Sequence, residues 1–515
     1  MKNRQIVNVI NFIRGVEPRV KIDLKEPVRE QIRLMKEHRL RGTFLLQYDA
    51  LIDPEYIEML KPLDKEQFEI GVWFETVKPQ VEKAGIEWTG RFPWDWHVHC
   101  GFSLGYTKEQ REKLVDVLYE EFFRVFGYYP RVFGSWLFDS HTLRYVSDRY
   151  GLDAACDCKE QYGTDGYTLW GGYYGQGYYP SRKNVFMPAQ SADDQLPAPV
   201  FRMLGSDPVY QYDFGMSADG GATAWQGVVT LEPVYAGGGY GGGEPKWVDW
   251  YFKENFNGEC LSFGYAQAGQ ENSFGWPRMK DGLTYQFEQL EKLQNEGKIT
   301  VEPLGETGRW YQKTYSETPA SAISAHSAFD DAEKESLWYS TSVYRVNLYS
   351  DHGNLRVRDL HVFSPNLPDP YEDAVCEGNC AAYETLPAID GNRFSGNGVI
   401  AGAYFARADG TPVQAGKMRF ADLGDGKARA DFGEIRALLK RDALRFESSG
   451  EFTLENRIGK DGGCKPETLL KDDQTVLFTY KNVKYALFAE KGRFLSPEKA
   501  VSENGVLEIR ILPRA

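Results

Sequence analysis

Two acidic residues stand directly after predicted strands and have the chemistry of a catalytic pair. Asp139 follows the apolar segment 131–137, and Glu271 follows a strand that begins near Cys260. A glycosidase needs two carboxyl groups beside one bond, about 5–5.5 Å apart for retention or about 6.5–9.5 Å apart for inversion. We therefore expect Asp139 and Glu271 to be the acid and the base or nucleophile of such a pair.

The residues that follow Asp139 have the pattern of a helix, so this segment is predicted to be a βαβ unit. The helix pattern covers residues 142–150 and stops at Gly151, and a second apolar strand follows over residues 152–156. In parallel α/β barrels the carboxyl ends of the strands form the catalytic face. A simpler interpretation stays open, in which Asp139 or Ser140 only caps the helix by accepting its free backbone N–H groups.

Further polar and aromatic residues stand beside this pair or at other predicted strand ends. Tyr and Trp offer flat apolar faces with a polar tip, which suit sugar rings. The predicted substrate-binding residues are Glu75, Trp96, His97, His99, Trp136, His141, Asp157, Gln270 and Trp276. Of these, Glu75 and Asp157 are the alternative carboxylates for the catalytic pair. The Gly- and Tyr-rich segment 162–179 and the Gly run 237–243 are predicted to be sugar-stacking walls, with self-packed loops as the alternative.

A metal site is the main competing interpretation. His97 and His99 share a face if their segment is extended, and with Asp139 and His141 they supply the donor atoms of a divalent-metal site. The His-x-His pattern is also common in loops. We predict no cofactor, with a divalent metal at His97 and His99 as the alternative.

The elements that must position these residues fall into two parts. Strands and helices alternate over residues 1–315, which predicts a parallel (β/α) barrel of seven or eight units as the catalytic domain. Residues 326–515 alternate in period two with Gly, Asn and Asp turns, which predicts an antiparallel β-sandwich domain. Residues 317–325 are expected to be the linker, and residues 438–445 one short helix.

Composition limits the classes of partner. The chain has 515 residues and a net charge of −14, which disfavours nucleic acid because phosphates are repelled. No segment approaches the roughly 18 apolar residues of a membrane helix, so we expect no membrane partner. Aromatic residues make up 14% of the chain, which favours an oligosaccharide or polysaccharide substrate. A homo-oligomer is left open. The N-terminus has no signal-peptide pattern, so we expect a cytoplasmic protein, or a periplasmic one if a leader has been removed.

The first 315 residues resemble the glycoside hydrolase/deacetylase superfamily of β/α barrels, which includes polysaccharide deacetylases and glycosidase families 38 and 57. Residues 9–15 stand where deacetylases place a strand that ends in an Asp pair, and residues 68–73, Phe-Glu-Ile-Gly-Val-Trp, resemble their "HEIGNH" strand. Residues 129–134 resemble the third deacetylase motif. Residues 134–139, Gly-Ser-Trp-Leu-Phe-Asp, are similar to the family 57 nucleophile strand Gly-x-Trp-Leu-Pro-Glu. Bacterial members with an appended β-sandwich have the same two-part organisation.

The departures from these motifs bear on the chemistry. Ile13 and Arg14 occupy the place of the deacetylase Asp pair, and Trp73 stands near the place of a metal-binding His. Family 57 has Glu where Asp139 stands and Asp where Glu271 stands. The resemblance therefore implies a barrel hydrolase that acts on carbohydrate, and its departures disfavour a deacetylase metal site.

Together these observations predict a carbohydrate-active enzyme, most simply a glycoside hydrolase that uses two carboxylates at the C-terminal mouth of a barrel. Two alternatives stay open. One is a metal-dependent carbohydrate deacetylase or hydrolase, and the other is a catalytically inactive sugar-binding barrel.

Overall fold

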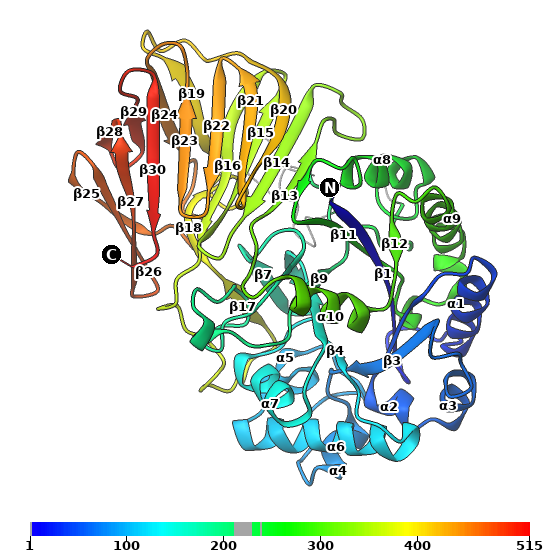
Figure 1. Cartoon of the computed structure of the whole chain (residues 1–515). Helices are drawn as coiled ribbons and strands as arrows, with labels where there is room; N and C mark the ends of the chain where they lie inside the picture. The colour runs from blue at the N-terminus through cyan, green and yellow to red at the C-terminus, as the bar shows by residue number, and fades with distance from the viewer. Residues whose placement is uncertain (1–2, 211–228, 237–238, 515) are drawn as a thin grey trace.

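The structure is a computed structural model that describes residues 3–210, 229–236 and 239–514, and it has the two predicted parts (Figure 1). The first is a curled sheet of parallel strands covered on its outside by helices. The second consists of large antiparallel sheets packed face to face. The predicted fold class, a β/α barrel followed by a β-sandwich, is confirmed.

The barrel strands pair in parallel along a path that follows the chain except at its first member. In spatial order they are β11 (Phe263–Ala268), β1 (Arg4–Ile13), β2 (Gly42–Leu46), β3 (Phe68–Trp73), β4 (Val132–Gly134), β5 (Ala154–Cys158) and β9 (Val200–Met203). Two short strands extend this sheet: β12 (Thr300–Val301) pairs with β1, and β8 (Gly177–Tyr178) pairs antiparallel with β9. Among the described residues no backbone hydrogen-bond ladder joins β9 to β11. A side chain contacts the backbone across this gap, because Leu204 N donates to Gln267 Oε1 at 2.8 Å.

Helices that connect these strands lie on the outside of the sheet (Figure 1). They are α1 (Lys25–Glu37), α2 (Tyr48–Leu51), α3 (Pro54–Leu60), α4 (Lys78–Lys83), α5 (Val98–Gly101), α6 (Lys108–Phe126), α7 (Ser140–Tyr150), α8 (Pro245–Asn255) and α9 (Trp276–Asn295). The last helix, α10 (Leu304–Thr314), instead crosses an end of the barrel and contacts β1 and β5. Their starts follow local chemistry: Thr107 and Gln110 form a capping box before α6. None of the helices in the described ranges is long and apolar enough to cross a membrane.

Apolar side chains fill the inside of the barrel, as in other packed barrels. Phe12 of β1 stacks on Trp73 of β3 with ring centroids 4.0 Å apart, and both rings are buried. Trp136 packs edge-on against both of them at 5.0 and 5.4 Å. Any ligand must therefore bind above this aromatic layer, at the ends of the strands.

Two antiparallel sheets form the sandwich. One runs in the order β10 (Cys260–Leu261), β13 (Ser321–Ala325), β14 (Lys334–Ser340), β15 (Tyr344–Asp351), β16 (Asn354–Val362), β19 (Gly402–Arg407), β24 (Phe452–Arg457), β29 (Lys499–Val501) and β28 (Arg493–Ser496), with β18 (Leu386–Asp390) also paired to β16. The other runs β20 (Ala415–Gly424), β21 (Lys427–Gly433), β22 (Ile435–Lys440), β23 (Ala443–Glu447), β30 (Val506–Leu512), β27 (Val483–Lys491), β26 (Thr475–Tyr480) and β25 (Glu467–Asp472). Their inner faces meet through pairs such as Phe405 and Phe446, with ring centroids 5.1 Å apart.

The helix predicted for residues 438–445 is wrong. These residues belong to the hairpin of β22 and β23, in which Leu439 pairs with Leu444. Burial on the inner face of the sandwich outweighs the helix propensity of the Leu, Lys and Arg residues in this segment.

The two parts share structure across the predicted boundary. Strand β10 lies within the barrel range but pairs with β13, so residues 321–325 of the expected linker form a sandwich strand. Strand β17 (Ala381–Glu384) pairs in parallel with β7 (Tyr167–Trp170), which also pairs with β6 (Gln161–Thr164). The domain limits at 315 and 326 stay a prediction.

Candidate active site

A cavity of about 300 Å³ opens at the carboxyl ends of the barrel strands. Its lining comes from segments that follow β1, β4, β5, β9 and β11, and from residues 232–235. This volume lies at the small end of the range for ligand pockets, roughly 300–1,000 Å³. The residues that line it are Glu17, Arg19, Val20, Trp136, Gln161, Asp165, Tyr167, Leu204, Glu232, Tyr235, Glu271, Ser273, Phe274 and Arg278.

Glu271 is held at this cavity by the turn after β11. Gly269 has φ +100°, and a Cβ there would lie 2.3 Å from the carbonyl oxygen of Ile10, so only glycine fits this close approach. The Asn272 side chain then fixes the turn, since its Nδ2 donates to the carbonyl oxygens of Arg14 and Leu24, both at 2.9 Å. The sequence places Glu271 where it can meet a ligand.

The surroundings of Glu271 favour its protonated form. The side chain is buried, and burial raises its pKa, an effect that the nearby Arg14 opposes. Its Oε1 accepts a short hydrogen bond from the Ser273 hydroxyl. Its Oε2 is buried and has no hydrogen-bond partner, although Arg14 Nη2 lies 3.3 Å away. The guanidinium of Arg14 is therefore the charged partner of this oxygen.

Arg14 stands behind Glu271 as a buried guanidinium. It forms a bidentate salt bridge with Glu75, in which Nε donates to Oε2 and Nη2 donates to Oε1, each at 3.0 Å. The same Nη2 faces Glu271, and the guanidinium carbon lies 4.0 Å from the centre of the Trp94 ring. Burial raises the pKa of Glu75 to about 7 despite this partner. Arg14 therefore balances two buried carboxylates at once.

Charged residues also line the mouth of the cavity. Arg19 donates to both carboxylate oxygens of Glu17, at 2.8 and 2.7 Å, and to Asp165 at 3.0 Å. The cavity holds a second buried carboxylate, Glu232, which accepts from the Thr230 hydroxyl at 2.9 Å. Two acids, Glu271 and Glu232, thus reach one cavity from different segments of the chain.

Trp136, Tyr167, Tyr235 and Phe274 supply aromatic surface to this cavity, and the predicted contact of Trp136 with substrate stays a prediction. Within the predicted wall 162–179, Asp165 and Tyr167 line the cavity. Tyr174 packs instead on Trp338 of the sandwich, with ring centroids 3.9 Å apart. In the predicted wall 237–243, residues 237 and 238 lie outside the described residues, and Tyr240 donates to Asp330.

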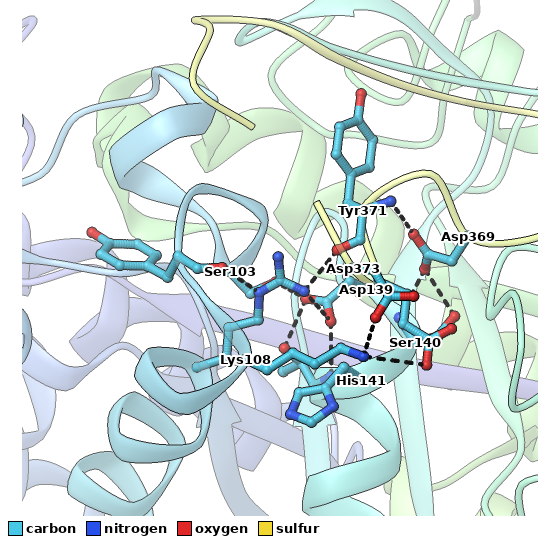
Figure 2. A network of polar contacts seen from close by, with 12 residues as sticks. Ser103, Lys108, Asp139, Ser140, His141, Asp369, Tyr371 and Asp373 are labelled. Atoms are coloured by element: carbon cyan, nitrogen blue, oxygen red, sulfur yellow. Dashed lines mark hydrogen bonds and ion pairs between the residues drawn. The ribbon is translucent and has the colours of Figure 1, made fainter. Parts of the chain in front are cut away.

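Asp139 has a different environment, in which it caps α7 (Figure 2). Its Oδ1 accepts from Thr142 N at 2.9 Å and pairs with Arg111 Nη1 at 2.9 Å. Its Oδ2 accepts from the hydroxyls of Ser103 and Thr142 at 2.6 and 2.7 Å. The side chain is fully buried and is not among the described residues that line the cavity. The structure does not bring Asp139 and Glu271 together there, and it gives Asp139 the capping role that the sequence left open.

The residues around Asp139 join the barrel to the sandwich part. Ser140 donates through its backbone N and its hydroxyl to Asp369, both at 2.8 Å (Figure 2). Lys108 of α6 pairs with Asp373 at 2.5 Å. The network therefore anchors residues 369–373 on the starts of α6 and α7.

The three histidines proposed for a metal site are spread over two elements. His97 precedes α5 and His99 lies on it, with ring centroids 5.8 Å apart, whereas His141 of α7 contacts Glu112 at 3.1 Å. Trp96 stacks near Phe92 at 5.9 Å. The described parts of the chain contain no group of three or more His, Cys, Asp or Glu that could hold a metal ion, and none of these four residues lines the cavity.

Gln270 and Trp276 lie close to Glu271 in the chain but do not line the cavity. Gln270 Nε2 donates to Glu232 at 3.4 Å. Trp276 is the first residue of α9 and is buried in the core. The predicted contact of these two residues with substrate stays a prediction.

Asp157 is buried on β5 beside Arg202, whose Nε lies 3.6 Å from its Oδ1. Arg202 also contacts Glu160, which pairs with Arg345 of the sandwich. Burial raises the pKa of Asp157 to about 7, and Arg202 offsets only part of this effect. Asp157 is thus part of a charged layer between barrel and sandwich, away from the cavity lining.

Replacing Asp157 with Asn is expected to flatten the pH dependence of stability. Because the native pKa lies above the unfolded value, the stability linked to this group is complete below about pH 4 and is lost as the pH rises through 7. Urea unfolding at several pH values should show that the wild type loses more free energy of unfolding than D157N between pH 4.5 and 7.5, by up to about 3 kcal/mol. D425N, at a 91% exposed side chain, is the control. Parallel curves for D157N and the wild type would contradict the expected role of this carboxyl.

Sequence reasoning missed most of the charged residues that line the cavity, which are Glu17, Arg19, Asp165, Glu232 and Arg278, and it missed the buried Arg14 behind them. One available signal was the run of charges directly after β1, where three of six residues are Arg14, Glu17 and Arg19. Glu232 carried no such signal, because it does not follow a barrel strand directly.

Comparison with known proteins gives a likeness of fold. No family model matches the chain, and no curated protein matches it. The "putative glycoside hydrolase/deacetylase" of Parabacteroides distasonis superposes with a TM-score of 0.55 at 16% sequence identity, over 74% of this chain and 90% of that one. The protein therefore shares the barrel fold that the sequence resemblance predicted.

Two further structures overlap less well. A "putative polysaccharide deacetylase" of Mycobacterium smegmatis gives a TM-score of 0.37 at 13% identity, over 62% of this chain and 94% of that one. A GH57-type branching enzyme of Pyrococcus horikoshii gives 0.30 at 10% identity, over 59% and 69%.

Proposed function

We propose that the protein is a carbohydrate-active hydrolase that cleaves a glycosidic bond in the cavity at the strand ends. The observation that carries this proposal is the position of Glu271, a buried carboxyl with a raised pKa that lines a cavity of about 300 Å³ beside several aromatic rings. The fold it shares with the Parabacteroides distasonis protein supports the same class of reaction.

Glu271 is the proposed acid. Its raised pKa keeps the proton on the carboxyl closer to neutral pH, so it can protonate the oxygen of the leaving sugar. Glu232 is the proposed second carboxylate, which acts as the base that activates water or as the nucleophile. Glu232 takes the place that the sequence prediction gave to Asp139, because it lines the same cavity as Glu271.

Arg14 and Glu75 are proposed to position Glu271. The two-bond contact between them fixes the guanidinium, and the guanidinium in turn faces the Glu271 carboxyl. Glu75 therefore acts at a distance from substrate, in contrast to the direct contact predicted from sequence.

A metal-dependent deacetylase fits these residues poorly. Arg14 stands where the deacetylase resemblance places an acidic ligand, and its buried positive charge lies against Glu75 and Glu271. A divalent cation at these carboxylates would meet that charge at short range, where repulsion is strong.

The test is a hydrolysis assay of the full chain against a glycan panel of varied sugars and linkages. We expect new reducing ends from at least one glycan, with a rate unchanged by EDTA. Release of acetate, or activity that EDTA abolishes and zinc restores, would favour the metal-dependent deacetylase instead. Binding without any turnover across the panel would favour the inactive sugar-binding barrel.

A further inference from the structure

A segment between β16 and β17 is hydrogen-bonded to the barrel, and we call its residues 371–381 the strap. Arg111 of α6 donates to the carbonyl oxygen of Tyr371 at 2.8 Å. At the other end, Ala381 N donates to the carbonyl oxygen of Gly166 at 2.9 Å. The strap is therefore held at both ends by segments of the barrel range.

Two cysteines of the strap, Cys376 and Cys380, face each other across a bend of the chain. Cys376 is 7% exposed, and its Sγ lies 3.3 Å from the carbonyl oxygen of Cys380 and 3.6 Å from that of Gly378. Burial raises the pKa of the Cys376 thiol, and the nearby Cys380 thiol adds to this effect. Cys380 itself is exposed. The buried sulfur therefore already points toward the residue with which it would form a disulfide.

The chain between these cysteines holds the start of a barrel helix. The carbonyl oxygen of Gly378 accepts from His99 N at 3.1 Å, and that of Asn379 accepts from Val98 N at 3.2 Å. Both N–H groups belong to α5. A bond between the cysteines would close a ring that contains both carbonyl groups, so it would fix the part of the strap that binds α5.

The strap also continues into the wall of the cavity. Strand β17 begins at Ala381, which pairs with Tyr167 of β7. Tyr167 and its neighbour Asp165 line the cavity. A change in the conformation of the strap would therefore reach one side of the cavity through a backbone ladder.

We propose that Cys376 and Cys380 are a redox modification site, at which a small-molecule disulfide such as oxidised glutathione generates an intramolecular disulfide that locks the strap on α5. This inference does not depend on the reaction proposed for the cavity.

The exposed thiol reacts first. The Cys380 thiolate attacks one sulfur of glutathione disulfide, and one glutathione leaves as a thiolate. The Cys376 thiolate then attacks the Cys380 sulfur, which forms the protein disulfide and releases the second glutathione. Both thiol protons pass to the released glutathiones, so the protein loses two protons and two electrons and glutathione disulfide is reduced. The five other cysteines are buried and should not compete: Cys100, Cys156, Cys158, Cys260 and Cys464.

The test exposes the folded full chain to glutathione disulfide, then unfolds it, alkylates the free thiols and identifies each cysteine by peptide mass. We expect residues 376 and 380 to escape alkylation together, with the loss of two hydrogen atoms and no bound glutathione, and dithiothreitol should reverse this. Hydrogen exchange should slow about threefold at the amides of Val98 and His99, because the closed ring opens less often.

Variants separate the pair from a single reactive thiol. C376S should keep a stable glutathione adduct on Cys380, whereas C380S should leave Cys376 reduced and the exchange at α5 unchanged. C464S, at a buried cysteine of the sandwich, is the matched control and should form the same disulfide as the wild type.

Three results would overturn the inference. One is a wild-type protein that keeps glutathione on Cys380 while Cys376 stays free, and another is a protein in which neither cysteine reacts. The third is a disulfide that forms but leaves the exchange of Val98 and His99 unchanged, which would remove the lock. If C376S does not fold, the comparison of C380S with the wild type decides alone.

Discussion

Replacing Glu271 with Gln is expected to lower the rate of glycan hydrolysis by a factor of about 10² to 10⁴, the usual contribution of one acid or base group. Gln keeps the size of the side chain and an acceptor for Ser273 but has no acidic proton that it can transfer to the leaving sugar. The steady-state kcat on the most active glycan of the panel measures this loss. The free energy of unfolding should change by less than about 2 kcal/mol, because Arg14 keeps its contact with Glu75.

A matched variant separates this effect from a general loss of charge. Glu58 lies exposed on α3 of the same barrel, and E58Q should keep full activity. E232Q should also lose activity, because the reaction needs both carboxyl groups. An E271Q enzyme that retains wild-type kcat would remove Glu271 from the mechanism.

Replacing Asp139 with Asn is expected to act on stability, with a loss of about 3 kcal/mol in the free energy of unfolding. Asn still accepts hydrogen bonds at the start of a helix, so the variant keeps the cap. It removes the negative charge beside Arg111, which is 1% exposed and lies 2.9 Å from Asp139. Breaking a buried ion pair by removing one partner typically costs 3–5 kcal/mol. Urea unfolding at pH 7 measures the difference.

The control for this variant is another capping aspartate. Asp53 caps α3 and pairs with Lys25 at 2.7 Å, but its side chain is 29% exposed. D53N should therefore lose less than about 1 kcal/mol. If D139N were as stable as the wild type but lost hydrolysis as completely as E271Q, Asp139 would be catalytic, as the sequence interpretation proposed.

The fold was predictable where the sequence has a strong local pattern. The unit of β4, α7 and β5 was expected from an apolar strand, a helical pattern and a stop at Gly151, and Gly151 indeed ends the helix with φ +71°. Prediction failed at residues 438–445, where good helix formers lie in the hairpin of β22 and β23. Their conformation depends on the opposite sheet of the sandwich, which no local pattern reveals.

The candidate site was predictable only in part, for a related reason. Glu271 and Trp136 follow their strands directly and line the cavity as expected. Asp139 also follows a strand directly, but Arg111 and Ser103 from neighbouring segments enclose it. A carboxylate at a strand end has the same local sequence whether it caps a helix or faces a ligand. The partner that distinguishes the two cases comes from elsewhere in the chain.

A crystal structure of the E271Q variant with an oligosaccharide bound tests the central claim most directly. The glycan is one that the wild-type enzyme has been shown to hydrolyse. Because the variant is slow, it should bind this glycan without cleaving it. We predict a sugar ring in the cavity between residues 271 and 232, with the oxygen of the scissile bond within about 3.2 Å of the residue 271 side chain. A glycan bound elsewhere, with its scissile bond beyond the reach of both residues, would contradict the account.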